Sequence, residues 1–187
     1  MKTKLMTFLS LSMLLASCAQ DESRDNVMPV EKQVTTNGSK TSGIASRSTV
    51  TLIKEVYHPS ILNAGQAITL EHNGQKFQLI MQYDHNLVLY RTFAGYTYPL
   101  WKSNTYRNNL SAYSMLVAQN DGNMVIYNNG IPLWNTNKTV NFHVNDPHMK
   151  LQLFSKTGAA IPTGYRMKFV LGGNNLNIND VFEIDFE

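Results

Sequence analysis

The chain has 187 residues, 43% of them hydrophobic and 10% aromatic, which is enough for one packed domain with additional segments. Charged residues make up only 16%, below the usual quarter, and the formal net charge of +3 falls to +1 if the lysines at positions 2 and 4 are removed with an N-terminal signal. Since no basic patch remains, we expect no nucleic-acid partner. The single cysteine, Cys18, excludes an internal disulfide and a cysteine metal cluster.

The N-terminus has the pattern of a secretory signal. Two lysines precede an apolar run over residues 5–15 that is too short to span a bilayer permanently. The run ends in Leu15-Ala16-Ser17-Cys18, which resembles the lipobox of bacterial lipoproteins. This resemblance implies that residues 1–17 are a signal peptide and that Cys18 is lipidated, so that acyl chains anchor the protein in a membrane. An ordinary signal peptide is the alternative.

The acidic pair that follows Cys18, at positions 21 and 22, resembles the surface-export signals of some Gram-negative lipoproteins. The resemblance implies an outer-membrane lipoprotein, with periplasmic and surface-facing orientations both open. Residues 18–48 are polar, without aromatics or a period, and such a segment buries too little apolar surface to fold. We therefore predict a flexible tether, followed by one globular domain over residues 49–187.

The globular part contains an internal repeat. Residues 82–90 and 119–127 both follow the pattern Gln-x-Asp-x-Asn-x-Val-x-Tyr, 37 residues apart. Each is followed by a similar trailer, Pro-Leu-Trp-x-Ser/Thr-Asn, at residues 99–104 and 132–137. Five residue types that recur in register with a shared trailer indicate two copies of one structural unit.

Each copy predicts a small antiparallel meander. In the second copy, residues 114–118 form the incoming strand, and the turn after it contains Asp121-Gly122, a strong hairpin signal. Residues 124–127 form the outgoing strand, and a second turn leads into a third strand over residues 131–134. In the first copy, residues 77–81 form the incoming strand and residues 87–90 the outgoing strand. A degraded third copy is expected over residues 148–154, with Phe154 in the place of the motif tyrosine and no trailer tryptophan. No helical pattern follows the signal.

These residues, from about position 60 to 154, resemble the bulb-type mannose-binding lectins first known from monocot plants, and residues 61–66 resemble the opening segment of that family. The resemblance implies an all-β fold, β-prism II, with three small antiparallel sheets around a pseudo-threefold axis. It also implies that Trp101 and Trp134 lie in the core. Residues 180–187 alternate as a half-buried strand, preceded by a loop at 172–175. Whether this strand closes its own prism, or is exchanged within a homodimer, is open.

The outward-facing motif residues are the candidate sugar site. Alternation along each outgoing strand turns Leu87, Leu89, Met124 and Ile126 inward and the motif side chains outward. A carboxylate, two amides and a phenol match the hydroxyls of a hexose, and a valine offers a contact for its C–H groups. The candidate sugar-binding residues are Gln82, Asp84, Asn86, Val88 and Tyr90, with Gln119, Asp121, Asn123, Val125 and Tyr127.

The resemblance implies mannose as the sugar, bound without a metal or cofactor. One carboxylate per motif is too few for calcium, and the histidines have no metal-ligand spacing. His85 replaces the small turn residue of the second copy and is expected to crowd the first pocket.

We therefore expect a non-enzymatic lectin that binds mannose-type glycans at a bacterial surface, since the two aspartates fall in separate repeats and cannot flank one glycosidic bond. The alternatives are a lectin-like bacteriocin relative and a structural or protein-binding module with vestigial sites.

Overall fold

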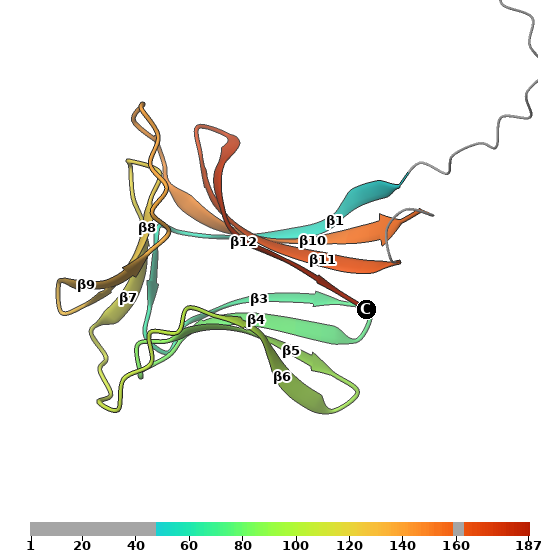
Figure 1. Cartoon of the computed structure of the whole chain (residues 1–187), viewed down its shortest axis with the longest axis horizontal. Coiled ribbons are helices and arrows are strands. Elements are labelled where there is room, and N and C mark those ends of the chain that lie inside the picture. Colours follow the sequence, from blue (N-terminus) through green and yellow to red (C-terminus); the bar gives the residue numbers. More distant parts are fainter. Residues whose placement is uncertain (1–47, 159–162) are drawn as a thin grey trace, which may run out of the picture. The chain divides into compact units, whose positions relative to one another are not determined.

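The computed structural model describes residues 48–158 and 163–187, which form three antiparallel four-stranded sheets (Figure 1). The predicted all-β class and the three-sheet architecture are confirmed. The predicted signal peptide, the predicted lipidation of Cys18 and the predicted tether up to residue 47 lie outside the described residues. Within the described ranges, no helix is long and apolar enough to cross a membrane.

The first-repeat sheet has the order β3-β4-β5-β6 and the second-repeat sheet the order β2-β7-β8-β9. The terminal sheet has the order β1-β10-β11-β12 and combines strands from both ends of the described chain. The strands are β1 (Thr49–His58), β2 (Ile61–Asn63), β3 (Ala67–His72), β4 (Gln75–Met81), β5 (Leu87–Phe93), β6 (Tyr96–Lys102), β7 (Ser114–Ala118), β8 (Met124–Asn128), β9 (Ile131–Asn135), β10 (His148–Thr157), β11 (Gly164–Gly173) and β12 (Leu176–Phe186).

The core lies where the inner faces of the three sheets meet. Alternation along β5 and β8 places Leu87, Leu89, Met124 and Ile126 in it, each 0% exposed, as the sequence predicts. The trailer tryptophans are partly buried against this core. Trp101 meets Trp134 edge-on with ring centroids 6.2 Å apart, an arrangement that aromatic pairs prefer.

The terminal sheet repeats a detail of the other two. In each sheet the register of the third and fourth strands shifts by one residue at a β-bulge, directly after a pair that includes an aromatic residue of the fourth strand. The three pairs are Leu89 with Trp101, Ile126 with Trp134, and Phe169 with Phe182. Phe182 also stacks on Trp101, with centroids 4.5 Å apart. It therefore takes the place of the missing third tryptophan.

This register corrects the predicted third copy. The expectation that Phe154 stands in the place of the motif tyrosine is wrong, because β10 is the incoming strand of the terminal sheet and β11 the outgoing one. The bulge places Val170 where the other sheets have tyrosine. The misassignment arose because β10 shows strand alternation but its pairing with β1 joins residues about 100 positions apart, a contact that local pattern does not reveal.

The C-terminal strand is confirmed as half-buried and pairs with β11 of the same chain. Exchange of this strand with a second chain stays a prediction. The loop expected at residues 172–175 is shorter than predicted: Gly172 and Gly173 belong to β11. The turn consists of Asn174 and Asn175, with φ angles of 51° and 60°, which match a tight hairpin turn whose twist follows that of the strands.

Candidate functional site

Each candidate site is built on the turn between an incoming and an outgoing strand. In the second repeat, Gly122 N donates to Gln119 O at 3.1 Å, and Gln119 N donates to Asn123 O at 2.9 Å. Only Gly122 in this turn has a positive φ, of 86°. The turn is therefore a type I turn followed by a left-handed residue, rather than the two-residue hairpin that Asp-Gly suggests. The longer turn brings the glutamine, the aspartate and the outgoing strand together.

The motif aspartate closes its own turn in both repeats. Asp84 Oδ1 accepts the N–H of Asn86 at 3.0 Å, and Asp121 Oδ1 accepts the N–H of Asn123 at 2.9 Å. This is the bond by which an Asx residue stabilises a turn two residues on. It uses one carboxylate oxygen, so the same side chain shapes the turn and retains a second oxygen as an acceptor.

The glutamine and the tyrosine are also linked in the same way in both repeats. Gln82 Nε2 donates to the Tyr90 hydroxyl at 3.2 Å, and Gln119 Nε2 donates to the Tyr127 hydroxyl at 2.9 Å. Each pair retains the amide oxygen as an acceptor and the phenolic hydrogen as a donor. The glutamine–tyrosine and aspartate–asparagine contacts are thus the same in the two repeats.

The motif asparagines are held by the trailers. Asn86 Oδ1 accepts from Ser103 Oγ at 3.1 Å and from Thr105 N at 3.2 Å. Asn123 Oδ1 accepts from Thr136 Oγ1 at 2.6 Å. Because the amide oxygen is used inside the protein, the amide nitrogen is the group offered to a ligand.

These trailer hydroxyls were missed as site residues. The sequence did contain a signal for them, because a hydroxyl residue, Ser103 or Thr136, occupies the same place in both copies of the trailer.

The valines form the floor of the two sites. Val88 is 3% and Val125 5% exposed, while the glutamines and tyrosines beside them are half-buried. A methyl-lined floor within a polar rim suits the C–H face of a sugar ring. Asn86, at 8% exposed, is more deeply set than its counterpart in the second repeat.

His85 does not crowd the first pocket, and that expectation is wrong. The residue is 1% exposed, and its Nδ1 lies 2.5 Å from Ser114 Oγ on β7, so the ring points into the protein. The left-handed backbone at this position, φ 71°, turns the side chain inward. In the second repeat Asn179 and Val140 take up the equivalent space, since a Cβ at Gly122 would stand 3.1 Å from each of them, and Asn179 Nδ2 donates to Gly122 O at 2.9 Å.

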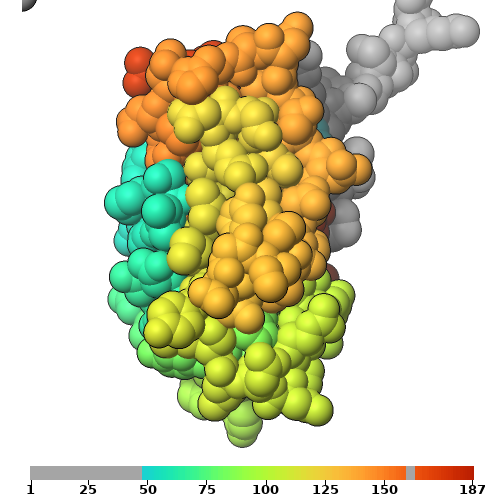
Figure 2. Space-filling model, turned by 90° about the vertical axis from the view of Figure 1, so that its left-hand side faces the viewer, coloured from blue at the N-terminus to red at the C-terminus, as the bar shows by residue number. Residues whose placement is uncertain are grey.

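A loop after each trailer clamps the preceding turn through backbone hydrogen bonds, and no sequence pattern predicted these loops. In the first repeat, Arg107 N donates to Asp84 O at 3.0 Å and Ser111 N donates to Tyr83 O at 2.8 Å. In the second repeat, residues 140 and 144 donate in the same way to the carbonyls of residues 121 and 120, at 2.9 and 2.8 Å. Figure 2 looks onto this side of the molecule, with the chain that follows β6 in lime and the chain that follows β9 in amber.

The terminal sheet carries different chemistry on the equivalent face. Arg166 stands where the other sheets have the motif asparagine, and Lys168 where they have the valine. Arg166 pairs with Glu183 and Asp185 at 2.7 Å each, and Lys168 also pairs with Glu183 at 2.7 Å. The Arg166 guanidinium, helped by a lysine ammonium, lowers the pKa of Asp185 to about 2. This face is an ion-pair network rather than a third copy of the site.

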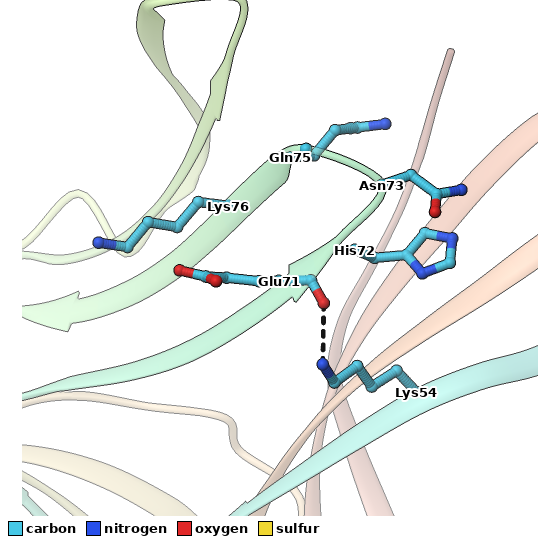
Figure 3. A pocket seen from close by; sticks show the side chains of 7 residues that line it. Lys54, Glu71, His72, Asn73, Gln75 and Lys76 are labelled. Atoms are coloured by element: carbon cyan, nitrogen blue, oxygen red, sulfur yellow. Dashed lines mark hydrogen bonds between the residues drawn. The ribbon is translucent and has the colours of Figure 1, made fainter.

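A separate hollow lies between β1 and the β3–β4 hairpin (Figure 3). Lys54 reaches from β1 and donates to Glu71 O at 2.9 Å, which ties the terminal sheet to the first-repeat sheet. None of the motif residues lines it. Across the described residues, no group of three or more histidine, cysteine, aspartate or glutamate side chains is placed to hold a metal ion.

The chain matches no family model and no curated protein sequence. Among solved structures it is similar to a monomeric monocot mannose-binding lectin from Gastrodia elata, with 23% identity over 69% of this chain and 94% of that one and a TM-score of 0.40. It is similar to the mannose-specific bulb lectin of Scilla campanulata, bluebell, with 24% identity over 62% and 94% of the two chains and a TM-score of 0.41. A lectin from Allium sativum is 28% identical over 58% and 97%, with a TM-score of 0.40.

Proposed function

We propose that this protein is a carbohydrate-binding lectin that recognises mannose-type glycans, without a metal, at two sites. The observation that carries the proposal is that both repeats form the same two hydrogen bonds, from the motif glutamine to the motif tyrosine and from the backbone of the motif asparagine to the motif aspartate. Chance similarity in turn-forming residues does not account for a glutamine, an aspartate and a tyrosine held in one arrangement twice.

The internal bonds determine what each site offers a hexose. The aspartate presents its second oxygen as a charged acceptor, and hydrogen bonds to charged groups contribute about 1.5–3 kcal/mol each. The asparagine presents amide N–H groups, the glutamine an amide oxygen, and the tyrosine a hydroxyl hydrogen. This alternation of donors and acceptors around a valine floor matches adjacent hydroxyls on one side of a pyranose ring.

The two sites belong to different sheets, which favours binding over catalysis. Asp84 lies at the first-repeat sheet and Asp121 at the second-repeat sheet. Glycosidases need two carboxyl groups about 5–9.5 Å apart across one bond, whereas each site here has one motif aspartate. Two separate sites on one chain instead support bridging of two glycan branches.

We further propose that the protein acts at a bacterial surface as a lipid-anchored glycan-binding protein. The support is the lipobox-like sequence that ends at Cys18, together with the polar segment after it. Many anchored copies would raise the effective concentration of shallow sites and give avidity well above that of one site.

The test is retention of the full chain on immobilised mannose. Asp84→Asn with Asp121→Asn keeps an oxygen to close each turn but removes the charged acceptor, so retention is expected to disappear. Asp146→Asn is the matched control: it removes a carboxylate from an exposed position whose φ of 50° asparagine tolerates. Failure of the unsubstituted chain to bind any glycan on a mannose-rich array would overturn the proposal.

A further inference from the structure

An arginine lies at one end of the core, on the inward face of the first-repeat sheet. Along this row of β5, Leu87 and Leu89 are 0% exposed, Arg91 is 7% exposed and Phe93 is 45% exposed. Arg91 pairs with Tyr98 of β6, so their side chains share this face. The β5–β6 hairpin and the end of β12 lie on the same side of the molecule (Figure 1). Arg91 therefore stands where the core meets solvent.

Aromatic rings surround the guanidinium group. Its carbon lies 4.9 Å from the ring centroid of Phe186, 5.4 Å from that of Phe93 and 5.7 Å from that of Tyr98. At these distances a cation is attracted to the face of an aromatic ring. Phe186 is held in turn by stacking on Tyr165, with centroids 5.8 Å apart. Phe93 and Tyr98 are 45% and 37% exposed, so two of the three rings also face solvent.

The charge of Arg91 has no acidic partner among the residues that the structure describes. All ion pairs of these residues lie in the terminal sheet and involve other cations. Arg91 Nε donates to Gln75 Oε1 at 2.7 Å, and neither terminal nitrogen is completely shielded from solvent. Because a charge taken out of water without a partner is costly, a ligand that supplies an acceptor to these nitrogens would be favoured.

The groups already in contact determine which ligand fits. The rings attract the charge but are weak hydrogen-bond acceptors, and Gln75 uses the Nε–H. The two terminal nitrogens are left, and their parallel N–H groups match the two oxygens of a carboxylate. Phe93 and Tyr98 lose exposed apolar surface to a flat ring, whereas a small hydrated anion covers little of it. The ligand therefore combines a carboxylate with a ring that has an apolar face.

We propose that Arg91, Phe93 and Tyr98 form a third binding site, which takes hexuronate residues of acidic glycans. The carboxylate of the sugar accepts hydrogen bonds from the terminal nitrogens of Arg91, and one face of the pyranose ring packs on Phe93 and Tyr98. Because these two rings lie at the surface, they cover one face of the sugar and leave the hydroxyl groups at its edge in water.

This site is independent of the two motif sites. Successive residues of a strand face opposite sides, so the motif residues Val88 and Tyr90 point outward and Arg91 points inward along the same strand. The inference therefore does not depend on the proposed mannose binding, and the two can be tested separately.

The experiment titrates the full chain with methyl β-glucuronoside by calorimetry. Asp84→Asn with Asp121→Asn forms the background, so that the motif sites do not contribute. Methyl β-glucoside, which lacks the carboxylate, is expected to bind at least about tenfold more weakly, because a charged hydrogen bond is lost. Acetate, which lacks the ring, is expected to bind about fivefold to tenfold more weakly, because it covers little aromatic surface.

Substitutions test which residues form the site. Arg91→Met keeps an apolar stem against the rings, removes the charge, and is expected to weaken glucuronoside binding at least about tenfold. Arg91→Lys keeps the charge without the paired N–H groups and is expected to weaken it about threefold. Phe93→Ala removes a surface ring and is expected to weaken it about threefold to fivefold. Arg107→Met, at an exposed position outside the site, is the matched control and is expected to bind like the parent.

The outcomes decide the inference without reference to mannose. If methyl β-glucuronoside binds no more tightly than methyl β-glucoside or acetate, the inference is wrong. It is also wrong if Phe93→Ala and a folded Arg91→Met bind the glucuronoside as tightly as Arg107→Met does. If Arg91→Met does not fold, as its unfolding curve would show, Phe93→Ala and Arg91→Lys decide the question. Retention of the unsubstituted chain on mannose is measured separately, so either proposal can fail alone.

Discussion

The hydroxyl of Thr136 offers a sharp test of how the second site is organised. It donates to Asn123 Oδ1 at 2.6 Å and accepts the N–H of Met124 at 3.1 Å. Thr136→Val keeps the shape of the side chain and removes both bonds. At about 0.5–1.5 kcal/mol for each bond, the free energy of unfolding is expected to fall by about 1–3 kcal/mol.

Binding is expected to weaken as well, although Thr136 itself offers nothing to the ligand. Without the hydroxyl, the Asn123 amide is no longer held with its nitrogen outward and must be ordered by the sugar. Loss of about 1 kcal/mol of this positioning corresponds to an affinity for methyl α-mannoside about fivefold weaker. Calorimetry in the Asp84→Asn background isolates the second site.

Two controls make the result decisive. Thr136→Ser keeps the hydroxyl and is expected to bind like the parent. Ser103→Ala, the equivalent change in the first repeat, is expected to weaken binding there by less, because Asn86 Oδ1 keeps a second donor in Thr105 N at 3.2 Å. If Thr136→Val loses stability but binds methyl α-mannoside as tightly as Thr136→Ser, the positioning role assigned to the trailer hydroxyl is refuted.

Three further outcomes follow from the packing and the charges. Gly65 has a φ of 83°, and Gly65→Ala places a Cβ 2.5 Å from the Tyr83 hydroxyl oxygen. The free energy of unfolding, followed by thermal denaturation, should fall by about 1–3 kcal/mol, and an unchanged melting temperature would contradict the close contact. The pKa of Asp185 is lowered to about 2 beside Arg166, so its ion pairs stabilise the fold fully above the unfolded pKa of about 3.9, and this stabilisation is lost as pH falls toward 2. Urea unfolding should therefore show that the free energy of unfolding of Asp185→Asn depends less on pH over this range. Phe182→Ala removes a ring that is 8% exposed and should lower the free energy of unfolding by about 3–5 kcal/mol, whereas a loss below about 1 kcal/mol would argue against its place at the centre of the three sheets.

The strands of the two repeats were predictable because their signals are local. The strands predicted over residues 77–81, 87–90, 114–118 and 124–127 fall within β4, β5, β7 and β8. The motif residues alternate outward and the leucines, methionine and isoleucine between them inward. One strand then determines the faces of its neighbours, because residues that pair across a ladder share a face.

The features that escaped prediction depend on contacts between distant segments. The loops that clamp the two turns act through backbone N–H groups, and a backbone bond leaves no residue type to recognise. The inward turn of His85 depends on a left-handed φ of 71° and on Ser114, which lies on another sheet. The strand β11 did leave a signal: Tyr165, Met167 and Phe169 alternate with polar residues. Its pairing with β10 and β12 was what identified it as the outgoing strand of the terminal sheet.

The terminal sheet explains how one scaffold carries two kinds of surface. Like the other two sheets, it has a β-bulge after a pair that includes a central aromatic residue, here Phe182 opposite Phe169. Its outer face nevertheless carries Arg166 and Lys168 where the repeats have asparagine and valine. Because successive residues of a strand face opposite sides, the outer row changes without altering the inner row that packs the core. The sugar-site substitutions are informative for a related reason: Asp84 and Asp121 lie in turns outside the core, and asparagine keeps the oxygen that closes each turn. A loss of binding with an unchanged unfolding curve therefore reports on the ligand contacts rather than on the fold.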